Sequence, residues 1–227
     1  MSSRTFRARA DRAGIPRTWV VDYGDASLDF VNTRWLRLTA KPAESLGDPE
    51  AILHWLQRKG AIDSATSGAW SKRLRRSPRL ARQLVREVTM VREALYRIFW
   101  AVTHRRRPGP ADLKRLNRVL AAGHSHPVVA FTAPLTATLV YRAGETGVTA
   151  ILAPIALSAA ELLTSGKLDR FRGCLNEECG VLFFDRTKNA GRRWCDMARC
   201  GALAKMRDYR SRVQASRQTP EPRLSRT

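Results

Sequence analysis

The spacing of the cysteines constrains this chain more than any other feature. All four lie between positions 174 and 200, as the pairs Cys174-x4-Cys179 and Cys195-x4-Cys200. Two close pairs suit a tetrahedral zinc site, because each pair brings two thiolates to one edge of the ion and the intervening segment folds back. Four thiolates leave no position open for water, so the spacing predicts one structural Zn²⁺ held by these four residues.

Two other uses of the cysteines remain open from the sequence. The thiols could form two disulfides in several pairings, or they could hold an iron–sulfur cluster. The N-terminal sequence lacks the apolar stretch of a secretion signal. The longest apolar region, 148–163, is interrupted by Pro154, Ser158 and Glu161, and it cannot span a bilayer. We therefore expect a cytoplasmic protein without membrane contact, whose thiols stay reduced and available to a metal.

The charge of the chain points to a polyanionic partner. The 227 residues contain 41 Lys and Arg against 20 Asp and Glu, which gives a formal net charge of +21 and a pI near 11.3. A GC-rich genome can favour Arg over Lys, but it does not explain the excess of basic over acidic residues. A balance this basic is typical of nucleic-acid-binding chains. The sequence holds no phosphate-binding loop, HExxH motif or nucleophile motif, so it does not predict an enzyme.

Composition and periodicity divide the chain into four parts. Residues 1–17 predict a disordered basic arm, 18–166 a mostly helical domain, 167–212 the cysteine module, and 213–227 a disordered tail. The longest periodic element is 79–104, where apolar residues recur at steps of three and four and predict a core-facing helix. Further helices are predicted at 27–38, 49–59, 67–74, 111–122 and 154–165, and strands at 18–21, 128–132 and 135–142.

The cysteine module reads as a knuckle, a hairpin and a helix. A polar turn joins the first two cysteines, strand Val181–Phe184 follows, and Arg192–Trp194 is expected to return as its partner strand before the helix through Lys205. The predicted fold is therefore α+β: a mostly helical N-terminal domain with a small β element, and a C-terminal treble-clef-like four-cysteine zinc finger. A module this small has little core, so the metal supplies its stability, about 10–16 kcal/mol in peptide models.

Basic residues in this module have a local and a functional interpretation. Four thiolates with Zn²⁺ carry a charge of about −2, and neighbouring cations could simply offset it. The cations exceed that charge, so we expect the surplus to meet phosphates. The candidate nucleic-acid-binding residues are Arg192, Arg193, Arg199, Lys205, Arg207, Arg210 and Arg212.

These motifs resemble a known pair of domains. Arg172-x-Cys174-x-Asn176-x-x-Cys179-Gly180, together with Trp194-Cys195-x-Met197-x-x-Cys200-Gly201 and Lys205, resembles the CGNR zinc finger. Upstream, Leu28-Asp-Phe-Val-Asn-Thr33 resembles the opening of the ABATE domain, and Leu152–Ala156 with Glu161–Leu163 resembles its end. The resemblance implies a bacterial, stress-responsive transcription regulator with a DNA-binding finger. The N-terminal domain would then sense a small-molecule effector or form a homodimer.

The chain departs from the family at the residues that give the finger its name. It has Cys200-Gly201-Ala202-Leu203 where the family has Cys-Gly-Asn-Arg. Neither missing residue is a metal ligand, so the zinc site is expected to survive, with Ala202 and Leu203 packing inward and Arg199 or Arg207 taking over DNA contact. The loss also leaves an alternative function open, a zinc-stabilised protein- or RNA-binding adaptor that does not read duplex DNA.

Overall fold

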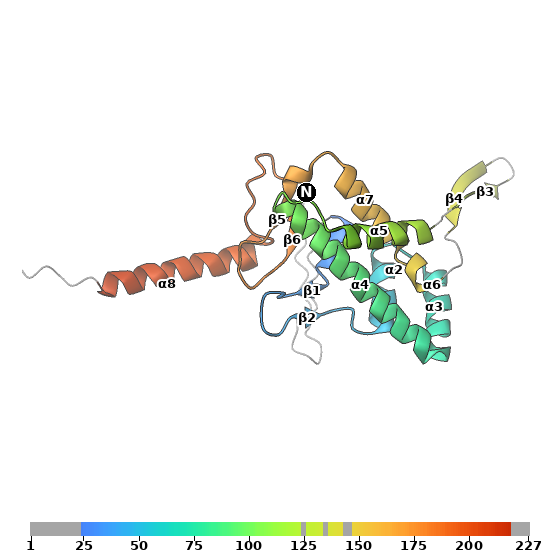
Figure 1. Cartoon of the computed structure of the whole chain (residues 1–227), viewed down its shortest axis with the longest axis horizontal. Helices are drawn as coiled ribbons and strands as arrows, with labels where there is room; N and C mark the ends of the chain where they lie inside the picture. Colours follow the sequence, from blue (N-terminus) through green and yellow to red (C-terminus); the bar gives the residue numbers. More distant parts are fainter. Residues whose placement is uncertain (1–23, 124–125, 134–135, 143–146, 219–227) are drawn as a thin grey trace, which may run out of the picture.

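The computed structural model describes residues 24–123, 126–133, 136–142 and 147–218 (Figure 1). The predicted arm at 1–17 and the predicted strand at 18–21 lie outside the described residues. The N-terminal region is mostly helical, and its strands form small two-stranded sheets. Its helices are α1 (Ala26–Val31), α2 (Pro49–Arg58), α3 (Ser64–Arg76), α4 (Pro78–Thr103), α5 (Pro110–Ala122), α6 (Gly147–Ala150) and α7 (Ala153–Thr164). Its strands are β1 (Arg34–Trp35), β2 (Ala43–Glu44), β3 (His126–Ala133) and β4 (Thr136–Arg142).

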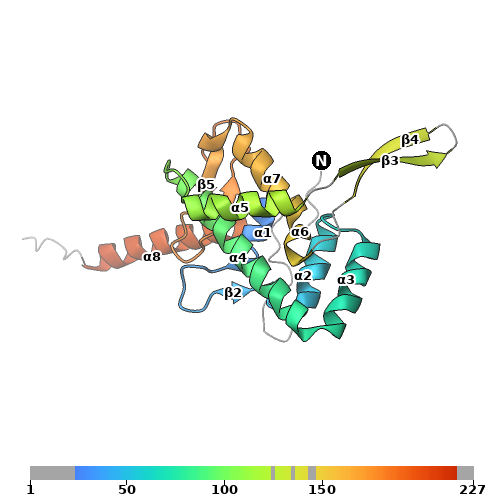
Figure 2. The same cartoon turned by 45° about the vertical axis from the view of Figure 1, so that its right-hand side comes forward.

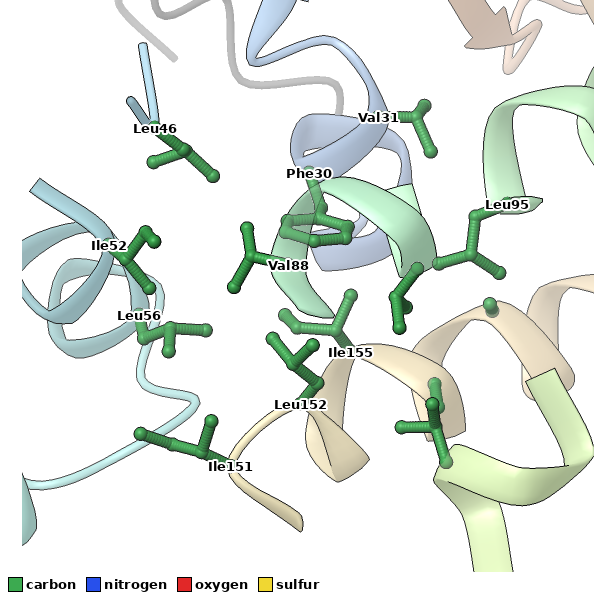
Figure 3. Packing of buried hydrophobic residues seen from close by; sticks show 14 of the residues in the cluster. Phe30, Val31, Leu46, Ile52, Leu56, Val88, Leu95, Ile151, Leu152 and Ile155 are labelled. Carbon is green, nitrogen blue, oxygen red and sulfur yellow. The ribbon is translucent and has the colours of Figure 1, made fainter. Parts of the chain in front are cut away.

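Helix α4 is the centre of the N-terminal region and packs against α1, α2, α3, α5 and α6. Helix α7 packs mainly on α1 and α5. The periodic run predicted at 79–104 is confirmed, because α4 begins at Pro78 and buries Leu84, Val88, Val91, Leu95 and Ile98. Figure 3 shows Val88 of α4 amid Phe30 of α1, Ile52 and Leu56 of α2, and Leu152 and Ile155 near the start of α7. One continuous core therefore joins helices from both ends of this region.

Side-chain caps fix where four of the helices begin. Asp25, Asp48, Asp63 and Ser77 each accept a hydrogen bond from a backbone N–H of the first turn that follows. The start of the helix predicted at 49–59 is confirmed. The helix predicted at 27–38 is too long: α1 ends at Val31, because Arg34–Trp35 leave the helix to pair as strand β1 with β2. The helix predicted at 67–74 is longer, Ser64–Arg76, because Asp63 caps it one turn earlier than the apolar residues indicate.

A buried arginine fastens the small β1–β2 sheet to α4. The Arg92 guanidinium is 1% exposed, and its two terminal nitrogens donate to the Glu44 carboxylate at 2.6 and 2.5 Å. Burial alone would raise the pKa of Glu44, but the hydrogen bonds and charge of Arg92 hold that pKa below its usual value. Beside it, Arg37 donates to Glu93 at 2.7 Å. The Arg92 and Arg37 side chains are buried, and their partly exposed carboxylate partners offset the cost of removing these two cations from water.

The two strands predicted around Pro134 are confirmed as the antiparallel pair β3–β4. This hairpin extends away from the helices in both views (Figures 1 and 2). Among the described residues, no helix is both long enough and apolar enough to cross a membrane.

The C-terminal part contains a second hairpin and a long helix. Its elements are η1 (Leu168–Arg170), β5 (Phe171–Gly173), β6 (Leu182–Phe184), the π-helical turn η2 (Met197–Gly201) and α8 (Ala202–Gln218). Helix α8 continues past Arg212, where the sequence placed the end of the module, so residues 213–218 are helical and not a disordered tail. Residues 219–227 lie outside the described part of the chain.

The predicted partner of strand β6 is wrong. Strand β6 pairs with β5, which precedes the first cysteine, and not with Arg192–Trp194. The reason is tertiary: Phe171 of β5 is buried against Phe99 of α4, with ring centroids 5.3 Å apart, and this contact brings β5 to the helical core. The segment before Cys195 runs elsewhere, where the Arg193 carbonyl accepts from the backbone N–H of Leu175 at 3.1 Å.

Candidate metal centre

The first cysteine pair lies in the loop of the β5–β6 hairpin. The backbone N–H of Cys174 donates to the Val181 carbonyl at 2.9 Å, and that of Cys179 donates to the Asn176 carbonyl at 2.9 Å. These bonds close a tight knuckle that turns both thiols to one side. Gly180 leaves the knuckle with a φ of +65°, a conformation that costs a glycine little.

The second cysteine pair lies at the turn that precedes the long helix. Asp196 caps η2, since its carboxylate accepts from the backbone N–H of Arg199 at 2.9 Å. Cys200 lies within η2, and α8 follows directly. The start of α8 is therefore fixed to the cysteine cluster through the turn that carries Cys200.

The four sulfurs converge on one point. Their Sγ atoms all lie within 4.8 Å of one another, and the Cys179–Cys195 and Cys195–Cys200 sulfurs are each 3.6 Å apart. A tetrahedral zinc ion with Zn–S bonds of about 2.3 Å requires sulfurs about 3.8 Å apart. All four cysteines are free, and three of them are buried. The cluster therefore fits one zinc ion, and the disulfide alternative does not describe it.

The thiols of this cluster cannot all ionise without a cation. Hydrogen bonds from Cys179 and Cys195 lower the pKa of Cys174 to about 2. Hydrogen bonding to Cys174 raises the pKa values of both Cys179 and Cys195, and burial raises them further. Four thiolates this close repel one another, and a divalent cation at the centre of the cluster would remove that repulsion. When bound, the ion would crosslink the knuckle, the η2 turn and the start of α8.

Two buried polar residues support the centre and were missed from the sequence. The Asn176 Nδ2 donates to the Cys200 Sγ at 3.4 Å, and its Oδ1 accepts from Arg207 at 3.4 Å. Asp185 is fully buried and accepts from the Thr187 hydroxyl at 2.6 Å and from the backbone N–H of Arg192 at 2.8 Å. Burial alone would raise the pKa of Asp185, but these hydrogen bonds lower it. Only the position of Asn176 inside the knuckle motif could have pointed to its role.

The seven basic residues predicted to meet nucleic acid fall into two groups. The first group has interaction partners: Arg192, Arg193, Arg207 and Arg212 have contacts inside the finger, and Arg199 also has a partner. Arg192 is the clearest case, because its guanidinium donates to the carbonyls of Trp194 and Cys195 and lies 4.8 Å from the Phe183 ring. The second group is Lys205 and Arg210 on α8, whose side chains are exposed and have no hydrogen-bond or ion-pair partner within the described residues.

The expected inward packing of Ala202 and Leu203 is wrong. Both residues are exposed, Leu203 at 45%. Met206 and Tyr209 are exposed on the same helix, at 46% and 64%. The positions where the family has Asn and Arg therefore present apolar side chains to the surroundings.

The finger is bonded directly to the N-terminal helices. The Asn32 amide, at the end of α1, donates to the Leu182 carbonyl at 2.7 Å and accepts from the Leu182 N–H at 3.1 Å, like an added strand residue. The Tyr96 hydroxyl of α4 donates to the Gly180 carbonyl at 2.9 Å. Side chains that follow α1 and lie on α4 thus hold the backbone of the knuckle and of β6 through hydrogen bonds.

Comparison with known protein families agrees with this architecture. Residues 24–166 match the ABATE family, described as "putative stress-induced transcription regulator", and residues 170–213 match the CGNR zinc finger. Neither is an enzyme family. No curated protein matches the chain. The ABATE match covers more than half of the sequence, and the CGNR match spans the four cysteines. The chain belongs to the ABATE family and carries a CGNR zinc finger with a four-cysteine site for one zinc ion.

Proposed function

We propose that this protein is a DNA-binding transcription regulator whose structural zinc ion holds α8 against duplex DNA. One observation supports the proposal most directly. Helix α8 begins at the cysteine cluster, leads away from the body of the protein (Figures 1 and 2), and carries the exposed cations of Lys205 and Arg210. Arginine and lysine on a projecting helix are the usual means of holding DNA phosphates.

The zinc ion has a structural part in this proposal. Its four thiolate ligands fill the tetrahedron, so the ion fixes the direction of α8 and leaves no position for a substrate. The candidate contacts are those named from the sequence. Lys205 and Arg210 are the primary pair, because the other five cations already have interaction partners. A regulator of this kind would act in the cytoplasm, where thiols stay reduced.

The N-terminal region would sense an effector or form a homodimer. The support for a sensing role is the bonding of Asn32 to β6 and of Tyr96 to the knuckle. If effector binding shifts α1 or α4, these hydrogen bonds would transmit the shift to β6 and the knuckle. The zinc cluster, and with it the start of α8, would then move as well.

Salt-dependent binding to a duplex tests the proposal. The zinc-loaded protein is titrated into a labelled random-sequence duplex of about 30 base pairs at about 50 and about 200 mM KCl. Binding should weaken steeply with salt, and the Lys205→Gln/Arg210→Gln variant should bind at least about tenfold more weakly. Lys114→Gln/Lys167→Gln removes the same charge from exposed sites outside α8 and should have little effect. If the parent does not bind the duplex at low salt, or binds it equally well at both salt concentrations, the proposal is wrong.

A second candidate, a protein- or RNA-binding adaptor, has one observation in its favour. Leu203, Met206 and Tyr209 are exposed on α8, and exposed apolar side chains often mark protein contacts. Competition separates the candidates: unlabelled duplex should displace the labelled duplex better than RNA or single-stranded DNA does. The reverse order of competitors would favour the adaptor.

A further inference from the structure

A second strongly basic surface lies at the turn between α3 and α4, far along the chain from the finger. We name it the α3–α4 corner and define it by Lys72, Arg73, Arg75, Arg76, Arg79, Arg82 and Arg86. All seven side chains are exposed. The stretch from Ser64 to Arg86, which contains them, has no Asp or Glu. In both views the corner lies at the opposite end of the helical core from α8 (Figures 1 and 2).

Among the described residues, only one of the corner's seven cations, Arg75, comes within ion-pair distance of an acidic side chain. Elsewhere, Arg92 is paired with Glu44, Arg97 with Asp112, and Arg118 with Glu87. At the corner, Arg75 approaches Glu50 at 3.6 Å, and both side chains are 64% exposed, so solvent screens this pair strongly. The side chains of Arg76, Arg79 and Arg82 have no hydrogen-bond or ion-pair partner within the described residues.

The positions of these arginines destabilise the protein when no anion is bound to them. Arg79 and Arg82 lie in the first two turns of α4, at the positive end of the helix dipole, and the first turn holds no acidic residue. Arg79, Arg82 and Arg86 are also spaced by three and four residues, which brings like charges together on one helix face. A bound polyanion would relieve both repulsions, so the arrangement suits an anionic partner.

The chemistry of the corner favours nucleic acid over a membrane surface. Among the described residues, no large apolar side chain is exposed between Ser64 and Arg86. Helices that lie on lipid need such side chains to insert between headgroups. Arginine, which supplies six of the seven cations, matches the geometry of phosphate groups through paired N–H donors.

From these observations we infer that the α3–α4 corner is a second surface for the phosphate backbone of duplex DNA. The inference rests on the proposed function, because it assigns a further contact to the same partner. The corner would hold DNA without reading sequence, while α8 contacts it at the other end of the molecule. A duplex that engages both surfaces must be long enough to reach around the helical core, or must bend.

The test compares two triple variants of the full-length, zinc-loaded protein with equal change of charge. Arg76→Gln/Arg79→Gln/Arg82→Gln alters the corner, and Arg105→Gln/Arg106→Gln/Arg107→Gln alters exposed arginines after the other end of α4. The length of α4, 26 residues, places the two sets about 39 Å apart. The probe is a labelled random-sequence duplex of about 40 base pairs, titrated at several KCl concentrations.

The corner variant should lower the slope of log K against log[KCl] by about 3, or about 0.9 for each lost phosphate contact, and should bind at least about tenfold more weakly at low salt. Its melting temperature without DNA should equal or exceed that of the parent, because like-charge repulsion is removed. The control triple should keep the parent's slope. Equal losses in both triples would mean that net charge alone acts, and would overturn the inference.

Other outcomes separate this inference from the proposed function. If the corner variant binds like the parent while Lys205→Gln/Arg210→Gln does not, the inference fails and the function stands. If the parent does not bind the duplex, both fail. If the corner triple abolishes binding to vesicles of phosphatidylglycerol but leaves duplex binding intact, the corner is a lipid surface and the inference is overturned.

Discussion

Asn176 links the metal site to the helix proposed to meet DNA. Its amide nitrogen donates to a sulfur of the cluster, and its amide oxygen accepts from Arg207 of α8. A hydrogen bond to a ligating thiolate spreads the charge of the sulfur and fixes its direction. Arg207 is held at the same time by Glu178, at 3.3 Å. One buried side chain therefore orients both a metal ligand and a basic residue.

Replacing Asn176 by Asp should weaken zinc binding by about 10- to 100-fold. The change keeps the size of the side chain and the oxygen that faces Arg207, but it removes the N–H donor and places a negative charge beside the thiolates. Competition with a chromophoric chelator measures the affinity. Asn189→Asp adds the same charge at an exposed position of the same module and should leave the affinity near that of the parent. Equal affinities for the two variants would refute the role given to Asn176.

Sequence reasoning at the residue scale succeeded where chemistry depends on spacing. The four cysteines could be assigned because their sulfurs have few uses and their intervals match a metal ion. Asn32 and Asp185 could not be assigned, since an Asn or Asp is common at helix ends and turns, and only the folded chain shows what it contacts. The exposure of Leu203 was missed for a related reason: an apolar residue at the start of a helix does not reveal which way that turn faces.

Strand β6 and the residue before it place alternate side chains in two different hydrophobic clusters. Val181 and Phe183 pack with the cysteines, whereas Leu182 and Phe184 pack with the helical core. Successive side chains of a strand point to opposite faces, so three or four residues suffice to join the two clusters. Gly180 precedes this strand at the closest approach of the knuckle to the N-terminal region, where an added Cβ would lie 2.8 Å from the Cβ of Arg37.

Gly180→Ala should destabilise the protein more than a glycine replacement that meets only backbone strain. The new methyl group would clash with Arg37, and alanine at φ +65° adds about 1–2 kcal/mol of its own. We expect a total loss of about 2–4 kcal/mol in the free energy of unfolding, measured by urea denaturation with zinc present. Gly166→Ala is the matched control, because Gly166 has a φ of +72° and no atom within 4 Å of the added Cβ. If the two variants lose equal stability, the knuckle does not pack tightly on Arg37.

Helices could be predicted from this sequence better than strand pairing. The positions of α2, α4, α5 and α7 follow from local signals, namely caps, proline at the first turn and apolar periodicity. The pairing of β6 depends on Phe171 reaching Phe99, a contact between residues far apart in the sequence. Arg192–Trp194 has similar residues and would be joined to β6 by a shorter loop than β5 is. Reasoning from neighbouring residues therefore favoured it as the partner of β6.

At the scale of the whole molecule, the finger and the N-terminal helices form one connected structure. Phe171 and Leu182 belong to the same core as α1, α4 and α7. The smaller cluster of the cysteines with Val181, Phe183 and Trp194 depends on the metal, because it has few apolar side chains of its own. The hairpin β5–β6 is therefore held from two sides, by the helical core and by the zinc site.

Removing zinc should release the outer part of the finger and leave the hairpin in place. Amide hydrogen exchange after chelation should show fast exchange from about residue 186 through α8, while β5, β6 and α4 stay protected.

In the Asn32→Ala variant, the buried Leu182 carbonyl loses its hydrogen-bond donor, which should lower the free energy of unfolding by about 1–3 kcal/mol. That variant should keep the hairpin protected with zinc and lose the protection of β6 without it, since β6 then has neither the zinc site nor the hydrogen bonds of Asn32 to hold it. If chelation alone exposes β6 in the parent, the helical core does not hold the hairpin. If Asn32→Ala with chelator still protects β6, the amide of Asn32 is not the attachment.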